Sequence, residues 1–218
     1  MKLSEFSHVI FDLDGVLLDT EKLYTQATQE VVGVYGKTFD WSLKVQMMGR
    51  HELDAAGVLV RTLGLPISAE EYLQRQLPIA EALFRTAAEV PGAEAFVESL
   101  AQRGLVLAVG TSSTRRLYEL KTSRHAWFSR FSAVVSGDHP EVHQLKPAPD
   151  IFLAAARAIA GAPERCLVVE DSPAGVTAAR AAGMSVIAIP DVALADARFA
   201  EADLIVRSYA EMRERLAD

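Results

Sequence analysis

The sequence predicts an α/β protein: a Rossmann-like parallel sheet with helices on both faces, and a small all-helical domain inserted after the first strand. Short apolar segments alternate with helical segments over most of the chain. These apolar segments are hydrophobic at successive positions, so both of their faces should be buried, as in a parallel sheet. Between residues 19 and 88 the alternation stops, and helical segments punctuated by Gly and Pro take its place. We therefore expect a core formed by residues 1–18 and 89–218 and a helical cap formed by residues 19–88.

The elements follow in a regular order. The apolar run at residues 9–11 predicts the first strand, which should be short and buried. Four helical segments of the insert are expected next, at residues 21–34, 41–48, 51–63 and 69–88. From Pro91 onward, further strands are expected at residues 105–110, 133–136, 166–170, 186–189 and 204–206. Helices should cover them at residues 93–103, 114–122, 149–160, 174–182 and 209–216.

Composition excludes several classes of protein. The 218 residues carry 22 Lys and Arg against 29 Asp and Glu, and the net charge of -7 argues against nucleic acid or an anionic membrane as a partner. Charged residues interrupt every apolar stretch before it reaches transmembrane length, and no apolar signal region follows Met1. The single Cys166 excludes an intrachain disulfide and indicates a reducing compartment such as the cytoplasm. We expect a monomer, and a dimer stays open.

Two aspartates follow the first predicted strand. Asp12 and Asp14 are two positions apart, so they would share one face of an extended chain, and Gly15 permits a sharp turn after them. Because two unpaired buried carboxylates would be costly, we expect them at a strand end where a cation neutralises them. One of them can attack an electrophile while the other transfers a proton. The alternative is a solvated Asp-Gly turn.

Polar residues also follow three later strands. Thr111 and Ser112 suit a phosphate oxygen at a strand-to-helix turn, although Ser and Thr are also common helix N-caps. Lys146 lies before Pro147 in a stiffened loop, where the alternative is a solvated lysine. Glu170 and Asp171 come directly after a buried strand, where Asp171 or Ser172 could instead cap the next helix. Ligands bind beyond the carboxyl ends of parallel strands, so these groups should share one site.

In combination, these segments resemble the four motifs of the haloacid dehalogenase superfamily. The first motif has the form DxDGxxxDT, and residues 12–20 read DLDGVLLDT. The third motif is usually GKPxPD, and here Leu145 replaces the glycine. The helical insert resembles the small α-helical cap of one subfamily. Residues 121–125, KTSRH, and residues 170–176, EDSPAGV, look like the pseudouridine-5′-phosphatase branch.

The resemblance implies a Mg²⁺-dependent phosphomonoester hydrolase acting on a small phosphorylated metabolite, such as pseudouridine 5′-phosphate, another nucleotide or a sugar phosphate. It implies that Asp12 is the phosphorylated nucleophile and Asp14 the general acid/base. Lys146 would balance charge and Thr111, with Ser112, would bind phosphate. The Mg²⁺ site would comprise Asp12, Asp171 and the backbone carbonyl of Asp14, with Glu170 further from the metal.

Other interpretations stay open. A mutase of the β-phosphoglucomutase type shares core and cap, but it carries a His in the helix entering the cap, where this chain has Tyr24. A haloalkanoate dehalogenase would not need the role of Asp14 or a metal, and a non-catalytic binding protein on this fold would have no use for an attacking carboxylate beside a proton donor.

Further candidates lie outside the four motifs. Tyr24 and Arg50 of the insert are candidates for selecting the leaving group, by stacking and hydrogen bonding. His139 and His143 lack companions at zinc-ligand spacing, so we expect no zinc site. The basic residues Lys121, Arg124 and His125 could anchor a substrate anion, but we favour a solvated helix end for them.

Overall fold

The computed structural model describes residues 1–47, 52–191 and 194–216. The chain divides into two compact units, one formed by residues 1–19 with 88–218 and the other by residues 20–87. Two chain segments connect them, and within the first unit these segments are hydrogen-bonded to each other. The Asp19 amide donates to the Ala88 carbonyl and the Val90 amide to the Leu17 carbonyl, at 2.9 and 3.0 Å.

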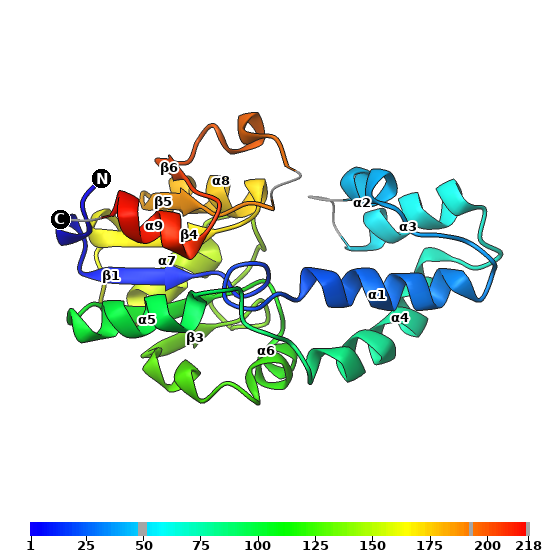
Figure 1. Ribbon diagram of the computed structural model, residues 1–218, viewed down its shortest axis with the longest axis horizontal. Helices are drawn as coiled ribbons and strands as arrows, with labels where there is room; N and C mark the ends of the chain where they lie inside the picture. The colour runs from blue at the N-terminus through cyan, green and yellow to red at the C-terminus, as the bar shows by residue number, and fades with distance from the viewer. Residues whose placement is uncertain (48–51, 192–193, 217–218) are drawn as a thin grey trace. The chain divides into compact units, whose positions relative to one another are not determined.

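The first unit is built on a six-stranded sheet whose paired strands are all parallel (Figure 1). The order is β3-β2-β1-β4-β5-β6. The strands are β1 (His8–Phe11), β2 (Val106–Gly110), β3 (Ala133–Val135), β4 (Cys166–Glu170), β5 (Ser185–Ala188) and β6 (Leu204–Ile205). The central strands β1 and β4 are buried along nearly their whole length, as expected when helices cover both faces. The predicted α/β fold class is confirmed.

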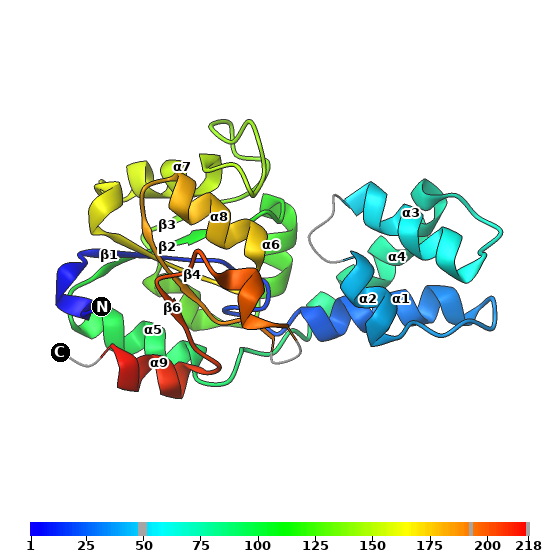
Figure 2. The same ribbon diagram turned by 90° about the horizontal axis from the view of Figure 1, so that it is seen from above.

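Helices cover the two faces of this sheet (Figure 2). On one face, α7 (Asp150–Ala158) packs on β1, β2 and β3, and α8 (Pro173–Ala181) packs on β4 and β5. On the other, α5 (Ala93–Gln102) packs beside α9 (Tyr209–Arg215). The Phe96 ring of α5 meets the Phe11 ring of β1 edge-on, with centroids 6.3 Å apart. The remaining α-helix that the structure describes in this unit, α6 (Arg115–Thr122), follows β2.

The second unit is helical: α1 (Glu21–Gly33), α2 (Trp41–Met47), α3 (Glu52–Leu63) and α4 (Ala69–Phe84). Its own core contains Val32, Leu59 and Tyr72, all almost fully buried. A capping box starts α4, because the Ser68 hydroxyl accepts from the Glu71 amide while the Glu71 carboxylate accepts from the Ser68 amide. The part of residues 20–87 that the structure describes contains no β-strand.

The structure differs from the predicted elements mainly at their ends. The helix predicted to run to residue 88 ends at Phe84, because the next amides form turns back to the Leu83 and Phe84 carbonyls and Glu89 then pairs with Leu18. Within the described residues, four short 3₁₀ helices were not predicted: Leu3–Glu5, Ala126–Arg130, Pro163–Arg165 and Asp196–Phe199. The predicted helix ends at Met48 and His51 lie outside the described residues. No described helix has the length and apolar character needed to cross a bilayer.

Candidate active site

The candidate site lies at the carboxyl ends of the two central strands. The chain runs outward from β1 to β3 and returns on the other side of β1 as β4, so the strand order reverses between β1 and β4. Such a switch point is the usual place for a ligand on an open parallel sheet. In the register, Phe11 pairs with Val109 and with Val169. Asp12 therefore lies level with the last residues of the two neighbouring strands.

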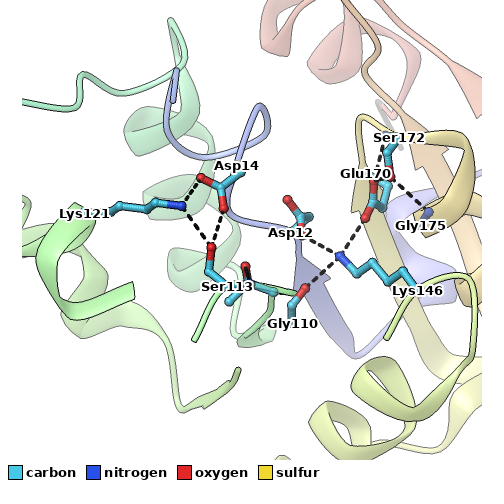
Figure 3. Close-up of polar contacts among 10 residues, drawn as sticks. Asp12, Asp14, Gly110, Ser113, Lys121, Lys146, Glu170, Ser172 and Gly175 are labelled. Carbon is cyan, nitrogen blue, oxygen red and sulfur yellow. Dashed lines mark hydrogen bonds and ion pairs between the residues drawn. The ribbon is translucent and has the colours of Figure 1, made fainter. Parts of the chain in front are cut away.

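Lys146 connects those three strand ends (Figure 3). Its Nζ lies 2.5 Å from Oδ1 of Asp12, 2.7 Å from Oε1 of Glu170 and 3.1 Å from the carbonyl oxygen of Gly110. The lysine side chain is only 7 % exposed, and its Nζ lies 4.7 Å from the centroid of the Phe152 ring. The structure therefore contradicts the interpretation of Lys146 as a solvated loop residue.

Leu145, which stands where the family motif has glycine, does not prevent this arrangement. Its side chain is exposed, and Lys146 still reaches Asp12.

Burial dominates the electrostatics of Asp12. Its pKa is raised to about 7 in total: loss of hydration is the largest cause, Lys146 opposes the rise, and the nearby carboxylates of Glu170 and Asp14 add to it. Burial alone would lower the pKa of Lys146, but Asp12 and Glu170 outweigh it and hold that pKa above its usual range. Lys146 is therefore a permanent cation, whereas Asp12 is a carboxylate that still lacks enough positive charge around it.

Glu170 is fully buried and uses both of its oxygens. Oε1 accepts from Lys146, while Oε2 accepts from the amide and the hydroxyl of Ser172, at 2.8 and 2.9 Å. The Ser172 hydroxyl also accepts from the Gly175 amide and so caps α8. A Cβ added to Gly175 would lie 1.8 Å from Oε1 of Glu170. The start of α8 is thus fitted around a carboxylate that is hydrogen-bonded to both Lys146 and Ser172.

Asp171 lies against the loop that carries the first two aspartates. A Cβ added to Gly15 would come within 2.1 Å of Oδ2 of Asp171, and Gly15 has a φ of +80°, which disfavours other residues. The Asp171 carboxylate is therefore close to the turn after Asp14.

Asp14 is held by a different set of residues from those around Asp12. Nζ of Lys121 donates to Oδ1 of Asp14 at 2.7 Å and to the Ser113 hydroxyl at 2.9 Å, and that hydroxyl donates to Oδ2 of Asp14 at 2.8 Å. In Figure 3 the Asp14 carboxylate points toward Lys121, while Asp12 points toward Lys146. The two neighbouring aspartates thus have separate cations.

The expectation that Lys121 belongs to a solvated helix end is wrong. Its side chain is 0 % exposed, because it lies on the buried face of α6 one turn after Tyr118 and ends on Asp14. The other two members of the basic run behave differently, since Arg124 is exposed and the His125 ring contacts the rings of Trp127 and Phe128.

The turn after β2 supplies the remaining predicted residues. Thr111 is buried, and its hydroxyl accepts from the Ser113 amide at 3.1 Å. Ser112 is exposed. The N-cap of α6 is Thr114, whose hydroxyl accepts from the Leu117 amide, so neither Thr111 nor Ser112 performs that role.

Of the two predicted residues in the helical unit, the structure describes one. The Tyr24 ring packs edge-on against Phe84, with centroids 4.8 Å apart. Tyr24 also lines a cavity of about 200 Å³ inside this unit, together with Thr28, Lys44 and Tyr72. Arg50 lies outside the described residues.

The donor set suits a hard cation that keeps several waters. Among the described residues, no group of three His, Cys, Asp or Glu side chains is arranged to hold a metal. The candidate ligands are instead two carboxylates, those of Asp12 and Asp171, and the backbone carbonyl of Asp14. Mg²⁺ is commonly bound by one or two carboxylates together with waters and substrate phosphate. The raised pKa of Asp12 indicates that a cation would also be electrostatically favourable there.

Sequence reasoning missed Ser113 and assigned the wrong environment to Lys121. The signal for Lys121 was present, because it follows Tyr118 by three residues and therefore shares its helix face. For Ser113 the sequence gives only its place in the same turn as Thr111.

Comparison with known proteins agrees with this geometry. The family model described as haloacid dehalogenase-like hydrolase matches residues 9–189. A (DL)-glycerol-3-phosphatase 2 from Arabidopsis thaliana is 43% identical over 95% of this chain and 89% of its own length. A probable pseudouridine-5'-phosphatase from Drosophila melanogaster is 42% identical over 97% of this chain and 93% of its own. The crystal structure of a putative beta-phosphoglucomutase from Thermotoga maritima matches with a TM-score of 0.77 and 31% identity, covering 92% of this chain and 94% of that one.

Proposed function

Because the chain belongs to the haloacid dehalogenase-like hydrolases and is a phosphoric monoester hydrolase, we propose that it works through an aspartyl-phosphate on Asp12. The observation that carries this proposal is the contact of Lys146 with both Asp12 and Glu170 at the ends of neighbouring strands. A buried nucleophile beside a permanent cation can approach a phosphate dianion that would otherwise repel it.

In the first step an oxygen of Asp12 attacks phosphorus while the bond from phosphorus to the leaving oxygen breaks. Lys146 offsets the charge shared by the nucleophile and the transferred group. Thr111 and Ser112 follow β2, where a hydroxyl and backbone amides can hold the phosphoryl oxygens. These two residues are positioned by the same strand end whose carbonyl contacts Lys146.

Asp14 supplies and later removes the proton. It protonates the leaving alkoxide in the first step. In the second step it takes a proton from the water whose oxygen attacks the phosphorus, and the Asp12 carboxylate is released. Each turnover therefore returns both aspartates to their starting state.

We propose Mg²⁺ as the cofactor, held by Asp12, Asp171 and the backbone carbonyl of Asp14. When bound, the cation would neutralise negative charge on the phosphoryl group and on the nucleophile. In this scheme Glu170 stays paired with Lys146 and does not bind the metal, because both of its oxygens are already hydrogen-bonded to protein groups.

The substrate class we propose is a small phosphorylated metabolite in a reducing, cytoplasmic compartment. The relatives reported above are named as a (DL)-glycerol-3-phosphatase and a probable pseudouridine-5'-phosphatase, and this chain resembles both about equally. We assign the phosphoryl chemistry to the α/β core and selection of the leaving group to the helical cap of residues 19–88, with Tyr24 and Arg50 as candidate contacts.

The test is phosphate release from a panel of phosphomonoesters that includes glycerol 3-phosphate, pseudouridine 5′-phosphate and small sugar phosphates. We expect turnover with Mg²⁺, loss with EDTA, and inhibition by Ca²⁺, which takes more ligands at longer distances and would let Asp12 bind with both oxygens. Full activity in EDTA would contradict the metal assignment. Isomerisation of a sugar phosphate without net phosphate release would favour the mutase interpretation that the Thermotoga maritima structure leaves open.

A further inference from the structure

Lys121 is a buried cation that the proposed chemistry does not use directly. It comes from α6, and its side chain is 0 % exposed. Its ammonium group contacts Asp14 at 2.7 Å and Ser113 at 2.9 Å, and Ser113 contacts the other oxygen of Asp14 at 2.8 Å. The three side chains form a closed triangle on the side of Asp14 that faces away from Asp12 (Figure 3).

Stability alone is a weak explanation for this triangle. Removing a lysine from water is costly, and a buried ion pair can often be replaced by apolar residues without loss of stability. A methionine at position 121 would fill a similar volume on the face that α6 buries through Tyr118. The pair therefore calls for an explanation in the chemistry of Asp14.

Direct contact with substrate is also excluded by the geometry. The ammonium group is buried and already hydrogen-bonded to two side chains. Because the Lys121 side chain is 0 % exposed, a substrate anion cannot contact it in this structure. Lys121 can therefore influence the reaction only through its neighbours.

We propose that Lys121 and Ser113 are positioning residues for Asp14, an inference that rests on the acid/base role given to Asp14 above. The ammonium group can only donate, so it keeps Oδ1 as an acceptor. A hydroxyl can donate or accept, so Ser113 can stay hydrogen-bonded to Oδ2 whether or not that oxygen carries a proton. The triangle thus holds both oxygens of the Asp14 carboxylate and fixes its orientation.

The experiment uses the dependence of kcat/KM on the leaving group. An alkoxide needs a proton as it leaves, whereas p-nitrophenolate is stable without one. Loss of the acid should therefore slow an alkyl phosphate, such as glycerol 3-phosphate, far more than p-nitrophenyl phosphate. The parameter kcat/KM includes every step through departure of the leaving group, so later hydrolysis of the aspartyl-phosphate does not affect the comparison.

We expect Lys121→Met to reduce kcat/KM for the alkyl phosphate by about 100-fold, and for p-nitrophenyl phosphate by no more than about 5-fold. Ser113→Ala should show the same selectivity with a smaller loss, and it tests the triangle even if Lys121→Met does not fold. Adding Lys121→Met to Asp14→Asn should cause little further loss, because both changes remove the same function. Glu119→Gln, an exposed change on the same helix, is the control for disturbance of α6.

Each result has a distinct meaning. If Asp14→Asn shows no leaving-group selectivity, the acid role and the proposal built on it both fail. If Asp14→Asn is selective but Lys121→Met and Ser113→Ala slow both substrates equally, the proposed function stands and the positioning role is wrong. Multiplicative losses in the double variant would overturn the proposal in the same way.

Discussion

Asp12 and Asp14 lie on one short loop, and each is paired with its own lysine. The surroundings of the two pairs differ. Lys146 joins Asp12 to Glu170, and all three side chains are nearly buried. Lys121 joins Asp14 to Ser113, and the Asp14 side chain is 21% exposed although the lysine is not. The first cluster is rich in negative charge, and the second pairs one cation with one anion. Further positive charge would therefore be favourable beside Asp12, the proposed nucleophile, whereas Asp14, the proposed proton carrier, is already paired with Lys121 and held by Ser113.

Asp12→Asn is the change with the largest expected effect, because it removes the proposed nucleophile, on which every substrate would depend. We expect kcat/KM to fall by at least about 10³-fold for alkyl and aryl phosphates alike. Phosphate release from the folded variant is the measurement, and Asp54→Asn, the same change at an exposed site in α3, is the control. Substantial turnover by the Asp12→Asn variant would contradict the assignment of Asp12 as the nucleophile.

Gly15→Ala tests the close approach of Asp171 to the loop. The new Cβ would clash with Oδ2 of Asp171, so we expect the carboxylate to move and activity to fall by roughly 100-fold. Gly36→Ala is the matched control, because Gly36 also has a positive φ, +67°, but no atom within 4 Å of the added Cβ. Backbone strain should cost each variant about 1 kcal/mol of stability, and Gly15→Ala should lose more because of its clash with Asp171. Equal activity in the two variants would show that Asp171 has no catalytic part.

Part of the candidate site and the fold class could be predicted from the sequence alone. The sequence was enough to identify three charged residues of the site, Asp12, Lys146 and Glu170. Two of them lie at the ends of apolar strands and the third precedes Pro147, and the strand ends of a parallel sheet converge. The resemblance to a family then supplied their expected roles, and the family itself is confirmed by the matches. The fold class followed from the alternation of apolar and helical segments, which depends only on local pattern.

The spacing of Lys121 from Tyr118 indicates a shared helix face, but the sequence does not reveal that the partner of Lys121 is Asp14. Lys121 lies 107 residues from Asp14, on a helix whose polar end looks solvated when it is read locally. Its burial depends on where α6 packs, which is a tertiary property. Ser113 was overlooked for the same reason, since nothing in a Thr-Ser-Ser turn indicates which hydroxyl faces a carboxylate 99 residues away.

The pH dependence of stability should separate the two clusters further. The pKa of Asp12 is raised to about 7 in the folded protein, well above the value for an unfolded chain. A carboxyl with a raised pKa binds its proton more tightly when folded, so its contribution to stability is full below the unfolded pKa and is lost as the pH rises through about 7. In EDTA, the stability of Asp12→Asn relative to wild type should therefore increase by roughly 1–3 kcal/mol between pH 4 and pH 8.

Chemical denaturation of both proteins across this pH range measures that difference. Added Mg²⁺ should stabilise the wild type at pH 8 and shrink the difference, without any need for substrate. A difference that stays constant with pH would contradict the account of Asp12 as a carboxylate short of positive charge.

An exposed ion pair gives the smallest effect. Arg115 and Glu119 are 3.0 Å apart on α6, with side chains 52% and 63% exposed. Because water screens such a pair, Glu119→Gln should change the free energy of unfolding by less than about 0.5 kcal/mol and leave kcat unchanged. Thermal unfolding and steady-state assays check both values. A large effect would show that disturbing α6 reaches Lys121, and it would weaken any conclusion drawn from changes on this helix.

The stereochemistry at phosphorus tests the central claim most directly. The substrate is a thiophosphate ester whose two non-bridging oxygens are different isotopes, hydrolysed in water that carries a third. Attack by Asp12 inverts the configuration and attack by water on the aspartyl-phosphate inverts it again, so the account predicts net retention in the released thiophosphate. Net inversion would show that water attacks the ester directly, and it would contradict the role of Asp12 as the nucleophile.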